Sequence, residues 1–366
     1  MYLSRINLSN FKNYEAYEEE FSDSINCIVG ANGTGKTNLL DAIFYLSMSK
    51  SAFNNIENQN IRHDEAFFFI KGDFLLNQKK YKLLASLQKG QKKTLKVNNK
   101  AYEKISEHIG RFPLVMIAPD DQDLVKEGSE TRRKFIDGLL AQIDREYLQN
   151  LIVYYKILKN RNLLLKQFAE KEFFDKDLLE PYNRGILQYG QLIYERRTAF
   201  CNEYLPLFLR HYQNLTLGKE NVDLKYVSEL DTTDFELEFR GNLSRDRMLQ
   251  RTSMGIHRDD FLFEIAGYPL KKFGSQGQQK SYIVALKLAM FEIIQQQKEF
   301  KPLLLLDDIF DKLDEQRIKR LMEMVASHTF GQIFITDARE ERTLKILEQN
   351  QLQAKIINVQ KRLKNI

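Results

Sequence analysis

Eight consecutive residues near the N-terminus have the types and spacing of a loop that holds phosphate groups. They fit the pattern G-x-x-x-x-G-K-[ST] and lie between a predicted buried strand, residues 25–29, and a predicted helix, residues 38–46. Glycines let the backbone turn its N–H groups inward, and the helix dipole adds partial positive charge at the same place. The sequence therefore predicts a nucleotide site built from Gly30, Ala31, Asn32, Gly33, Thr34, Gly35, Lys36 and Thr37.

Two residues of this loop and two aspartates far along the chain are expected to act on the phosphates. We expect Lys36 to neutralise the β and γ phosphates of ATP and Thr37 to offer its hydroxyl to magnesium. Residues 303–306 are four leucines, typical of a buried strand, and Asp307 and Asp308 follow them. Asp307 is then the expected magnesium ligand. Asp308 is expected to orient or deprotonate the attacking water, unless the pair only ends a strand and caps the next turn.

A second candidate anion site precedes another predicted helix, whose apolar residues between 283 and 293 fall on one face. Small and hydrogen-bonding side chains at a helix N-terminus can hold an anion, although a simple helix cap is the alternative. Two phosphate sites in one chain predict a homodimer, in which the second site reaches the γ phosphate held by the partner. The residues of this second site are Ser275, Gln276, Gly277 and Gln278.

The elements that must position these residues suggest an α/β protein with an insertion. The chain has 366 residues, of which 43% are hydrophobic and 29% charged, so it can bury a large core. Alternating short runs in residues 67–105 predict antiparallel hairpins, and residues 131–211 predict two or three long helices. We expect one α/β head formed by residues 1–120 and 245–366, with a mainly helical lobe, residues 121–244, inserted between them.

Two further patterns bear on the compartment. The sequence has neither a long apolar run nor a signal-peptide pattern at its start, so we expect a cytoplasmic protein with no membrane partner. Two cysteines, Cys27 and Cys201, are too few for a disulfide framework or a cysteine-built metal site.

The basic residues are concentrated rather than spread. The formal net charge is only +5, but residues 71–104 contain ten lysines against Asp73 and Glu103, with Tyr81 and Tyr102 among them. This segment is a candidate surface for the DNA backbone, or else a set of solvated hairpin edges. No base-reading motif is visible, so binding should follow DNA shape and charge. A second candidate is formed by Arg132, Arg133 and Lys134.

These motifs together resemble an ATPase head of the ABC and SMC type, and most closely the RecF family of bacterial DNA repair ATPases. The resemblance covers nearly the whole chain. It includes G-A-N-G-T-G-K-T-N-L-L at residues 30–40 and S-Q-G-Q-Q-K at residues 275–280. It also includes P-D-D at 119–121, R-R-K-F-I-D at 132–137 and G-I-H-R-D-D at 255–260, in the family order. The resemblance implies a P-loop head of the ABC/SMC type with antiparallel hairpins and an inserted helical lobe.

The resemblance also implies a function in recombinational repair and replication restart. The family uses ATP to form a dimer that clamps DNA at junctions of single-stranded and duplex regions and at gaps. It works with RecR, and with RecO as a further partner, to load recombinase. ABC transporters usually carry Glu where this chain has the shorter Asp308, so we expect ATP hydrolysis to be weak and slow. We also expect DNA to stimulate this hydrolysis.

Several residues within the resemblance have two interpretations. Lys12 and Asn13 either approach the base or α phosphate of the nucleotide or form a solvated turn. His257 and Arg258 belong to a family-like motif without a derivable role, and a salt-bridge network with Asp259 and Asp260 is an equal alternative.

Other protein classes remain as competing interpretations. One is a soluble ABC ATPase that drives transport, which would be expected to carry an L-S-G-G-Q signature. Another is an ATP-gated scaffold that does not hydrolyse ATP. A full SMC protein is excluded, because residues 131–211 are too short for its long coiled coils.

Overall fold

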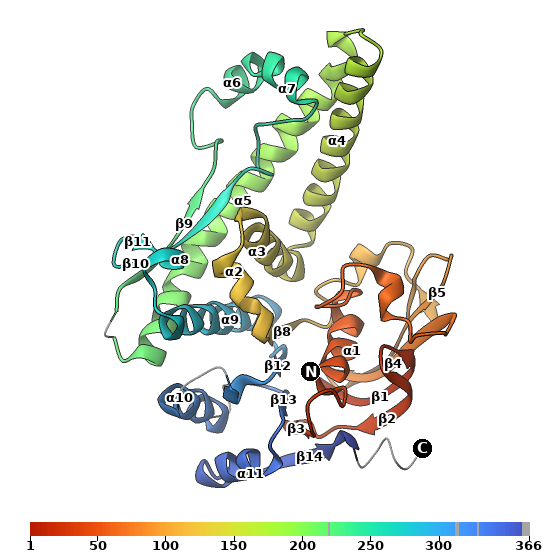
Figure 1. Cartoon of the computed structure of the whole chain (residues 1–366), viewed down its shortest axis with the longest axis vertical. Helices are drawn as coiled ribbons and strands as arrows, with labels where there is room; N and C mark the ends of the chain where they lie inside the picture. The colour runs from red at the N-terminus through yellow and green to blue at the C-terminus, as the bar shows by residue number, and fades with distance from the viewer. Residues whose placement is uncertain (219, 312–314, 328, 361–366) are drawn as a thin grey trace. The chain divides into compact units, whose positions relative to one another are not determined.

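The computed structural model describes residues 1–218, 220–311, 315–327 and 329–360 (Figure 1). The chain forms two compact units. The first, which we call the head, comprises Met1–Asp121, His211–Leu217 and Gln276–Ile366. The second, which we call the lobe, comprises Gln122–Arg210 and Gly218–Ser275.

A parallel sheet forms one layer of the head. Four of its strands are fully buried along their length, as expected when both faces of a sheet are covered, and the edge strand β14 is half-buried. The apolar runs at residues 25–29, 303–306 and 332–335 predict three of them, and the flanking strands β8 and β14 were not expected. In spatial order the strands are β14 (Ala354–Asn358), β3 (Ile25–Val29), β13 (Ile333–Asp337), β12 (Leu303–Leu306) and β8 (Leu114–Ile117).

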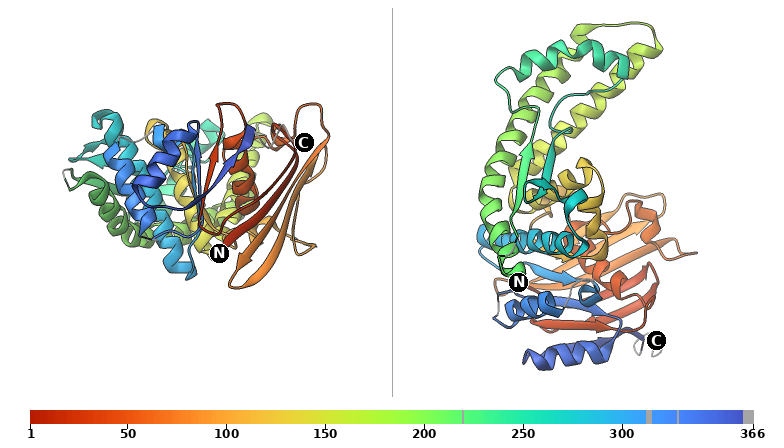
Figure 2. Two further views of the ribbon diagram at one scale, coloured as in Figure 1. Left: turned by 90° about the horizontal axis from the view of Figure 1, so that it is seen from below. Right: turned by 60° about the vertical axis from the view of Figure 1, so that its left-hand side comes forward.

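An antiparallel sheet forms the other layer of the head, and it contains the predicted hairpins (Figure 2). Side chains alternate between the core and solvent along its long strands, because successive residues of a strand point to opposite faces. In spatial order the strands are β2 (Tyr14–Glu20), β1 (Tyr2–Phe11), β4 (Phe67–Leu76), β5 (Lys79–Gln88), β6 (Thr94–Val97) and β7 (Lys100–Ala101).

Helix α1 (Lys36–Met48) packs between the two sheets. It contacts β1, β4 and β5 of the antiparallel sheet and β8 and β13 of the parallel sheet. Leu39, Ile43 and Leu46 are fully buried there, within one core cluster that both sheets share. The N-terminus of α1 is thereby fixed against the ends of the parallel strands. The head also contains α9 (Gln276–Lys298), α10 (Glu315–Ala326), α11 (Glu340–Gln349) and the short 3-10 segments Glu57–Asn60, Ile105–Glu107, Pro119–Gln122 and Ile309–Asp311.

The lobe is mainly helical, as predicted, but it also holds a small sheet. Strand β10 (Asp260–Ile265) pairs antiparallel with β9 (Val222–Val227) and with β11 (Tyr268–Pro269). This pairing places residues 245–275 with the lobe, whereas the sequence-based division placed them with the head. The lobe helices are α2 (Asp123–Lys126), α3 (Ser129–Ile143), α4 (Arg145–Glu170), α5 (Lys176–Thr216, whose last turns lie in the head), α6 (Phe235–Gly241), α7 (Leu243–Leu249) and α8 (Leu270–Phe273). Within the described ranges, no helix has the length and apolarity needed to cross a bilayer.

Candidate nucleotide site

The glycine-rich loop connects β3 to α1 and is braced by the turn between β1 and β2. Gly35 has a φ of 104°, which favours glycine, and a Cβ there would lie 2.5 Å from Nδ2 of Asn13. The hydroxyl of Tyr14, which is buried, donates a hydrogen bond to the Gly35 carbonyl at 3.0 Å. The loop can therefore keep its tight path only with glycine at this position.

The side chain of Lys36 lies against the start of the loop. It is buried, and its Nζ donates hydrogen bonds to the carbonyl oxygens of Gly30 at 2.9 Å and Ala31 at 3.1 Å. These contacts hold the ammonium group beside the backbone that would surround a phosphate. A buried cation at a helix N-terminus is well suited to an anionic ligand.

Thr37 and Asp307 meet at the carboxyl ends of the parallel strands. The Thr37 hydroxyl lies 3.1 Å from both carboxylate oxygens of Asp307. Thr336 at the end of β13 donates to Oδ1 of Asp307 at 2.8 Å. The register explains this contact, because Leu306 of β12 pairs with Ile335 of β13, so the next residues of both strands lie side by side.

Burial, together with the neighbouring charge of Asp308, raises the pKa of Asp307 to about 6. Hydrogen bonds from Thr336 and Thr37 and the charge of Lys36 act in the opposite direction. A buried carboxylate beside a hydroxyl oxygen is the donor set that a hard divalent cation prefers. Thr37 and Asp307 therefore fit magnesium.

Asp308 is held in a strained conformation beside this pair. Its φ is 45°, which is uncommon for a residue with a side chain, and such strain gathers at functional sites. Its N–H donates to the Thr336 hydroxyl at 2.8 Å. Its Oδ1 is buried and has no hydrogen-bond partner in the described part of the chain. A carboxylate oxygen in that state is an acceptor available to a ligand.

Asn13 and Lys12 follow each other in the turn between β1 and β2, but they have different partners. Asn13 donates to the Thr34 carbonyl at 3.3 Å and accepts from Nδ2 of Asn38 at 2.7 Å, so it contacts the glycine-rich loop. Lys12 forms an ion pair of 2.6 Å with Asp41, which is fully buried in α1. The structure thus places Asn13 against the glycine-rich loop. The ammonium group of Lys12 is instead paired with the buried carboxylate of Asp41.

The second predicted anion site lies at the start of α9, which begins at Gln276. Ser275 is the last residue of the lobe, and Gln276, Gly277 and Gln278 belong to the head. A Cβ on Gly277 would lie 3.1 Å from Nη1 of Arg317, so a larger residue would displace that arginine. The predicted helix is present, and its apolar face is buried in the head.

The G-I-H-R-D-D motif forms part of a buried network in the lobe. Arg197, fully buried, donates to the carboxylates of Asp137 at 2.8 Å and Asp259 at 2.9 Å. Nδ1 of His257 lies 2.8 Å from the hydroxyl of Tyr154. Removing one partner of such a buried ion pair would leave an uncompensated charge. The motif therefore stabilises the lobe, whereas its Arg258 is exposed.

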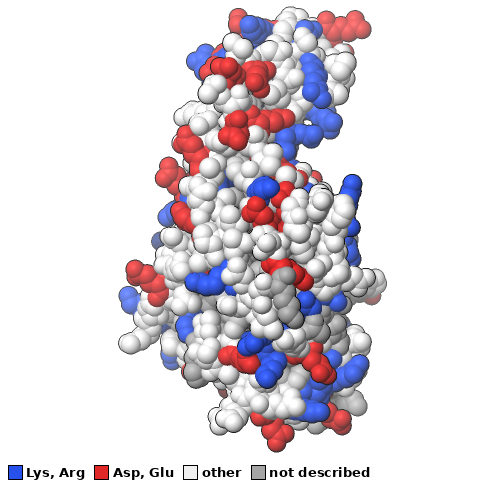
Figure 3. All heavy atoms as spheres, turned by 90° about the vertical axis from the view of Figure 1, so that its left-hand side faces the viewer, with Lys and Arg blue, Asp and Glu red and all other residues white. Residues whose placement is uncertain are grey.

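The second candidate DNA surface consists of Arg132, Arg133 and Lys134, and all three side chains contact other residues of the lobe. Arg132 forms a bidentate ion pair with Asp260 at 2.7 and 2.8 Å, and Lys134 lies 2.7 Å from Glu130. Arg133 donates to the Asp259 carbonyl at 2.5 Å. Arg132 and Lys134 are thus paired with carboxylates, and Arg133 is buried and hydrogen-bonded within the lobe. On the face shown in Figure 3, acidic and basic side chains are interspersed.

Three site or motif contacts were not predicted from the sequence. Thr336 was assigned no role, although the meeting of parallel strand ends could have placed it beside Asp307. Tyr14 was assigned no role, because the sequence does not show which carbonyl a tyrosine at the start of a strand contacts. Arg197 lies within a long helical pattern and was assigned no role.

Comparisons with known proteins agree with this geometry. Residues 2–362 match the family model described as RecF/RecN/SMC N terminal domain. The chain is 49% identical over 359 residues to the DNA replication and repair protein RecF of Flavobacterium johnsoniae, covering 98% of this chain and 100% of that protein.

Two solved structures are similar over most of the chain. One is described as the recombination mediator protein RecF-ATP in the RecFOR pathway, with a TM-score of 0.87 and 30% identity, covering 93% of this chain and 92% of that one. The other is described as RecF-ATPrS in the same pathway, with a TM-score of 0.85 and 30% identity, covering 93% of both chains.

Proposed function

Since this chain belongs to the RecF family of DNA replication and repair proteins, with the predicted ABC/SMC-type ATPase head, we propose that ATP joins two copies of it into a dimer that clamps DNA. The observation that carries the proposal is the meeting of Thr37 with Asp307 beside the glycine-rich loop. This arrangement joins a phosphate-binding loop to an acidic residue from a distant strand, as ATP hydrolysis requires.

The loop residues 30–37 bind the phosphates of ATP through backbone N–H groups, and Lys36 supplies a positive charge. Asn13 supports the loop through the Thr34 carbonyl. Thr37 and Asp307 would hold magnesium, which when bound supplies positive charge to the phosphate oxygens. Because the buried Asp307 has a raised pKa, a bound cation would also stabilise its ionised form.

Asp308 is the proposed catalytic carboxylate. Its backbone is fixed by Thr336, and its buried Oδ1 is available to accept a hydrogen bond from the attacking water. Asp has one methylene fewer than Glu, so its reach to the water is shorter and hydrolysis is slow. Slow hydrolysis suits a switch, because the ATP-bound dimer then persists long enough to act on DNA.

The start of α9 is the proposed contact with the partner's nucleotide. Ser275, Gln276 and Gln278 would donate hydrogen bonds to the γ phosphate bound by the second copy, and the helix dipole would favour its charge. Two such contacts related by a two-fold axis make ATP part of the interface. ADP lacks the γ phosphate and would not support the same interface.

The proposed DNA substrate is a junction of single-stranded and duplex DNA, as in a gapped duplex. We propose RecR as the protein partner, with RecO as a further partner, in the loading of recombinase at gaps. The similarity to proteins named for the RecFOR pathway supports this assignment. DNA binding is expected to stimulate the ATPase, because a dimer held on DNA keeps both nucleotide sites complete.

Binding of a fluorescent gapped duplex, with phosphate release measured in the same samples, tests the proposal. We expect tight binding with ATP and magnesium, weaker binding with ADP, and phosphate release that rises when the DNA is added. Equal DNA binding with ATP, with ADP and without nucleotide would contradict the proposed switch. DNA binding that depends on ATP without any phosphate release would instead identify a scaffold that does not hydrolyse ATP.

A further inference from the structure

The antiparallel sheet of the head has one face in the core and one exposed face. Along β4, Phe68 and Ile70 are fully buried, so the alternate residues Phe67, Phe69 and Lys71 point outward. Phe67 is 43% exposed, an unusual position for a phenylalanine. The outer face therefore presents two aromatic rings in a row on one strand.

Three lysines lie on the same face, beyond Phe69 along the sheet. In the register of the sheet, Lys71 of β4 is opposite Leu84 of β5, and Leu84 is opposite Lys96 of β6. Lys82 lies two residues from Leu84 on the same face, so the three lysines spread over three adjacent strands. The Nζ of Lys71 lies 4.8 Å from the centre of the Phe69 ring, in a cation–π contact.

In the part of the chain that the structure describes, the charges of these three lysines are not paired with carboxylates. Among the ten lysines of residues 71–104, an ion pair within the described chain is formed by Lys93, with Glu57 at 2.5 Å. Lys71, Lys82 and Lys96 have none there. The acidic Glu18 on the same face is already paired with Arg5 and accepts a hydrogen bond from Asn7. The positive charge of the three lysines is thus available to an anionic ligand.

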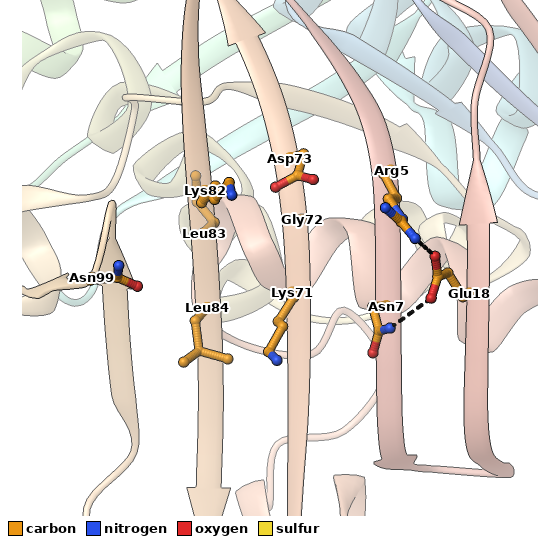
Figure 4. A pocket seen from close by; sticks show the side chains of 10 residues that line it. All are labelled: Arg5, Asn7, Glu18, Lys71, Gly72, Asp73, Lys82, Leu83, Leu84 and Asn99. Carbon is orange, nitrogen blue, oxygen red and sulfur yellow. Dashed lines mark hydrogen bonds and ion pairs between the residues drawn. The ribbon is translucent and has the colours of Figure 1, made fainter.

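A hollow of about 350 Å³ lies on this face, and its lining is rich in hydrogen-bond donors (Figure 4). Lys71 and Lys82 line it from β4 and β5, and the amides of Asn7 and Asn99 lie at its sides. Lysine ammonium and side-chain amide groups are common partners of DNA phosphate oxygens. Two acids, Asp73 and Glu18, also line the hollow, and Asp73 lies opposite Lys82 in the register.

The exposed ring of Phe67, followed on the same face by the half-buried Phe69 and its neighbour Lys71, fits unpaired nucleotides better than a duplex. Bases of single-stranded DNA can stack on an aromatic ring, whereas bases in a duplex are already stacked on each other. Such stacking tolerates any sequence, because every base has a π face. Lysines beside the rings neutralise the phosphates that connect the stacked bases.

We propose that the outer face of the antiparallel sheet binds the single-stranded part of gapped DNA. Phe67 and Phe69 stack on unpaired bases, and Lys71, Lys82 and Lys96 contact the phosphates. This inference rests on the proposed DNA-binding function and specifies which part of the DNA lies on which surface.

A single tryptophan tests the stacking directly, because the chain contains none. In a Phe67→Trp variant, we expect an oligothymidine to quench the tryptophan fluorescence in the presence of ATP, and a duplex of the same length to leave it nearly unchanged. The matched control is Leu237→Trp, at a 77% exposed position in α6 of the lobe, which should not respond. No quenching in the Phe67→Trp variant under conditions where the DNA is bound would overturn the proposal.

The lysines are tested by charge removal. We expect Lys71→Gln, Lys82→Gln and Lys96→Gln together to weaken binding of single-stranded DNA at least about tenfold. The slope of log K against the logarithm of the salt concentration should become shallower by roughly 2, which is about 0.7 for each phosphate that no longer has a lysine partner. Asp73→Asn should tighten binding. The control with the same charge change is Lys156→Gln, Lys159→Gln and Lys166→Gln, at exposed positions of α4.

The outcomes separate the two proposals. If the unaltered chain binds gapped DNA but the sheet variant and the α4 variant bind equally well, the surface assignment is wrong and the DNA-binding function stands. If the unaltered chain binds no DNA with ATP, both proposals fail. Weaker binding confined to the sheet variant supports the assignment.

Discussion

Thr37 and Asp307 are 270 positions apart in the chain, yet the Thr37 hydroxyl lies 3.1 Å from both carboxylate oxygens of Asp307. The contact depends on β13, which lies between β3 and β12 and brings their carboxyl ends to one edge of the sheet. It joins the two parts of the head that the inserted lobe separates in sequence. The nucleotide site is therefore complete only when both ends of the chain have folded together.

Replacing Lys36 with Ala should weaken ATP binding about ten- to a hundredfold, since it removes a charge-assisted interaction of roughly 1.5–3 kcal/mol. The variant lacks the buried ammonium and its hydrogen bonds to two loop carbonyls. Isothermal titration with ATP measures the effect, and Lys156→Ala on α4 is the control. Unchanged affinity in the Lys36→Ala variant would refute the assignment of this loop.

Replacing Ser275 with Arg should leave ATP binding by one copy intact but block association. The larger, charged side chain would stand at the start of α9, where the partner's γ phosphate is proposed to lie. Sedimentation velocity with ATP, alongside titration of ATP affinity, separates the two effects. ATP-driven dimers of normal stability in this variant would rule out the proposed contact.

Replacing Asp308 with Asn should slow phosphate release at least about a hundredfold while dimers still form, because the amide cannot accept a proton from water. Phosphate release under saturating ATP and gapped DNA is the measurement, and Asp23→Asn, at an exposed position, serves as the control. A variant that hydrolyses ATP at the original rate would exclude Asp308 as the catalytic carboxylate.

The buried His108 should make the head less stable in acid. Burial is the main cause that lowers its pKa from 6.5 to about 4. The charge of Arg111 acts in the same direction, and the hydrogen bond that Nε2–H of His108 donates to the Leu46 carbonyl acts against both. Between about pH 6.5 and pH 4, the His108 imidazole is therefore protonated in the unfolded chain but neutral in the folded chain. The free energy of unfolding consequently decreases as the pH falls through this range.

Between pH 7 and pH 5 this histidine should account for a loss of about 2 kcal/mol in the free energy of unfolding. Urea unfolding at both pH values measures it. His108→Gln should show a correspondingly smaller difference between the two conditions, even if it is less stable at both. An equal pH dependence in the variant and the unaltered chain would show that His108 does not titrate in this way.

Local patterns in the sequence were enough to predict much of the fold. The run of residues 25–29, the leucines at 303–306 and the alternation in residues 67–105 were correctly assigned to strands. The helical block of residues 131–211 was also correct. Each of these signals lies within a short window, where the period of apolar residues and the turn residues decide the local structure.

Contacts between distant segments could not be predicted in the same way. Thr336 bridges Asp307 and the Asp308 backbone only because β12 and β13 pair in one register. The ion pair of Lys12 with Asp41 depends on how α1 packs against the turn between β1 and β2. The lobe sheet formed by β9 and β10 likewise joins segments more than thirty residues apart, and no local pattern shows which strands will pair.

The mass of the unaltered protein in solution tests the central claim most directly. Sedimentation velocity with ATP and magnesium, with ADP, and without nucleotide should show a dimer in the first sample and predominantly monomer in the other two. Adding gapped DNA to the ATP sample should favour the dimer further. A monomer that persists at saturating ATP and DNA would contradict the account, because then no second copy completes the nucleotide site.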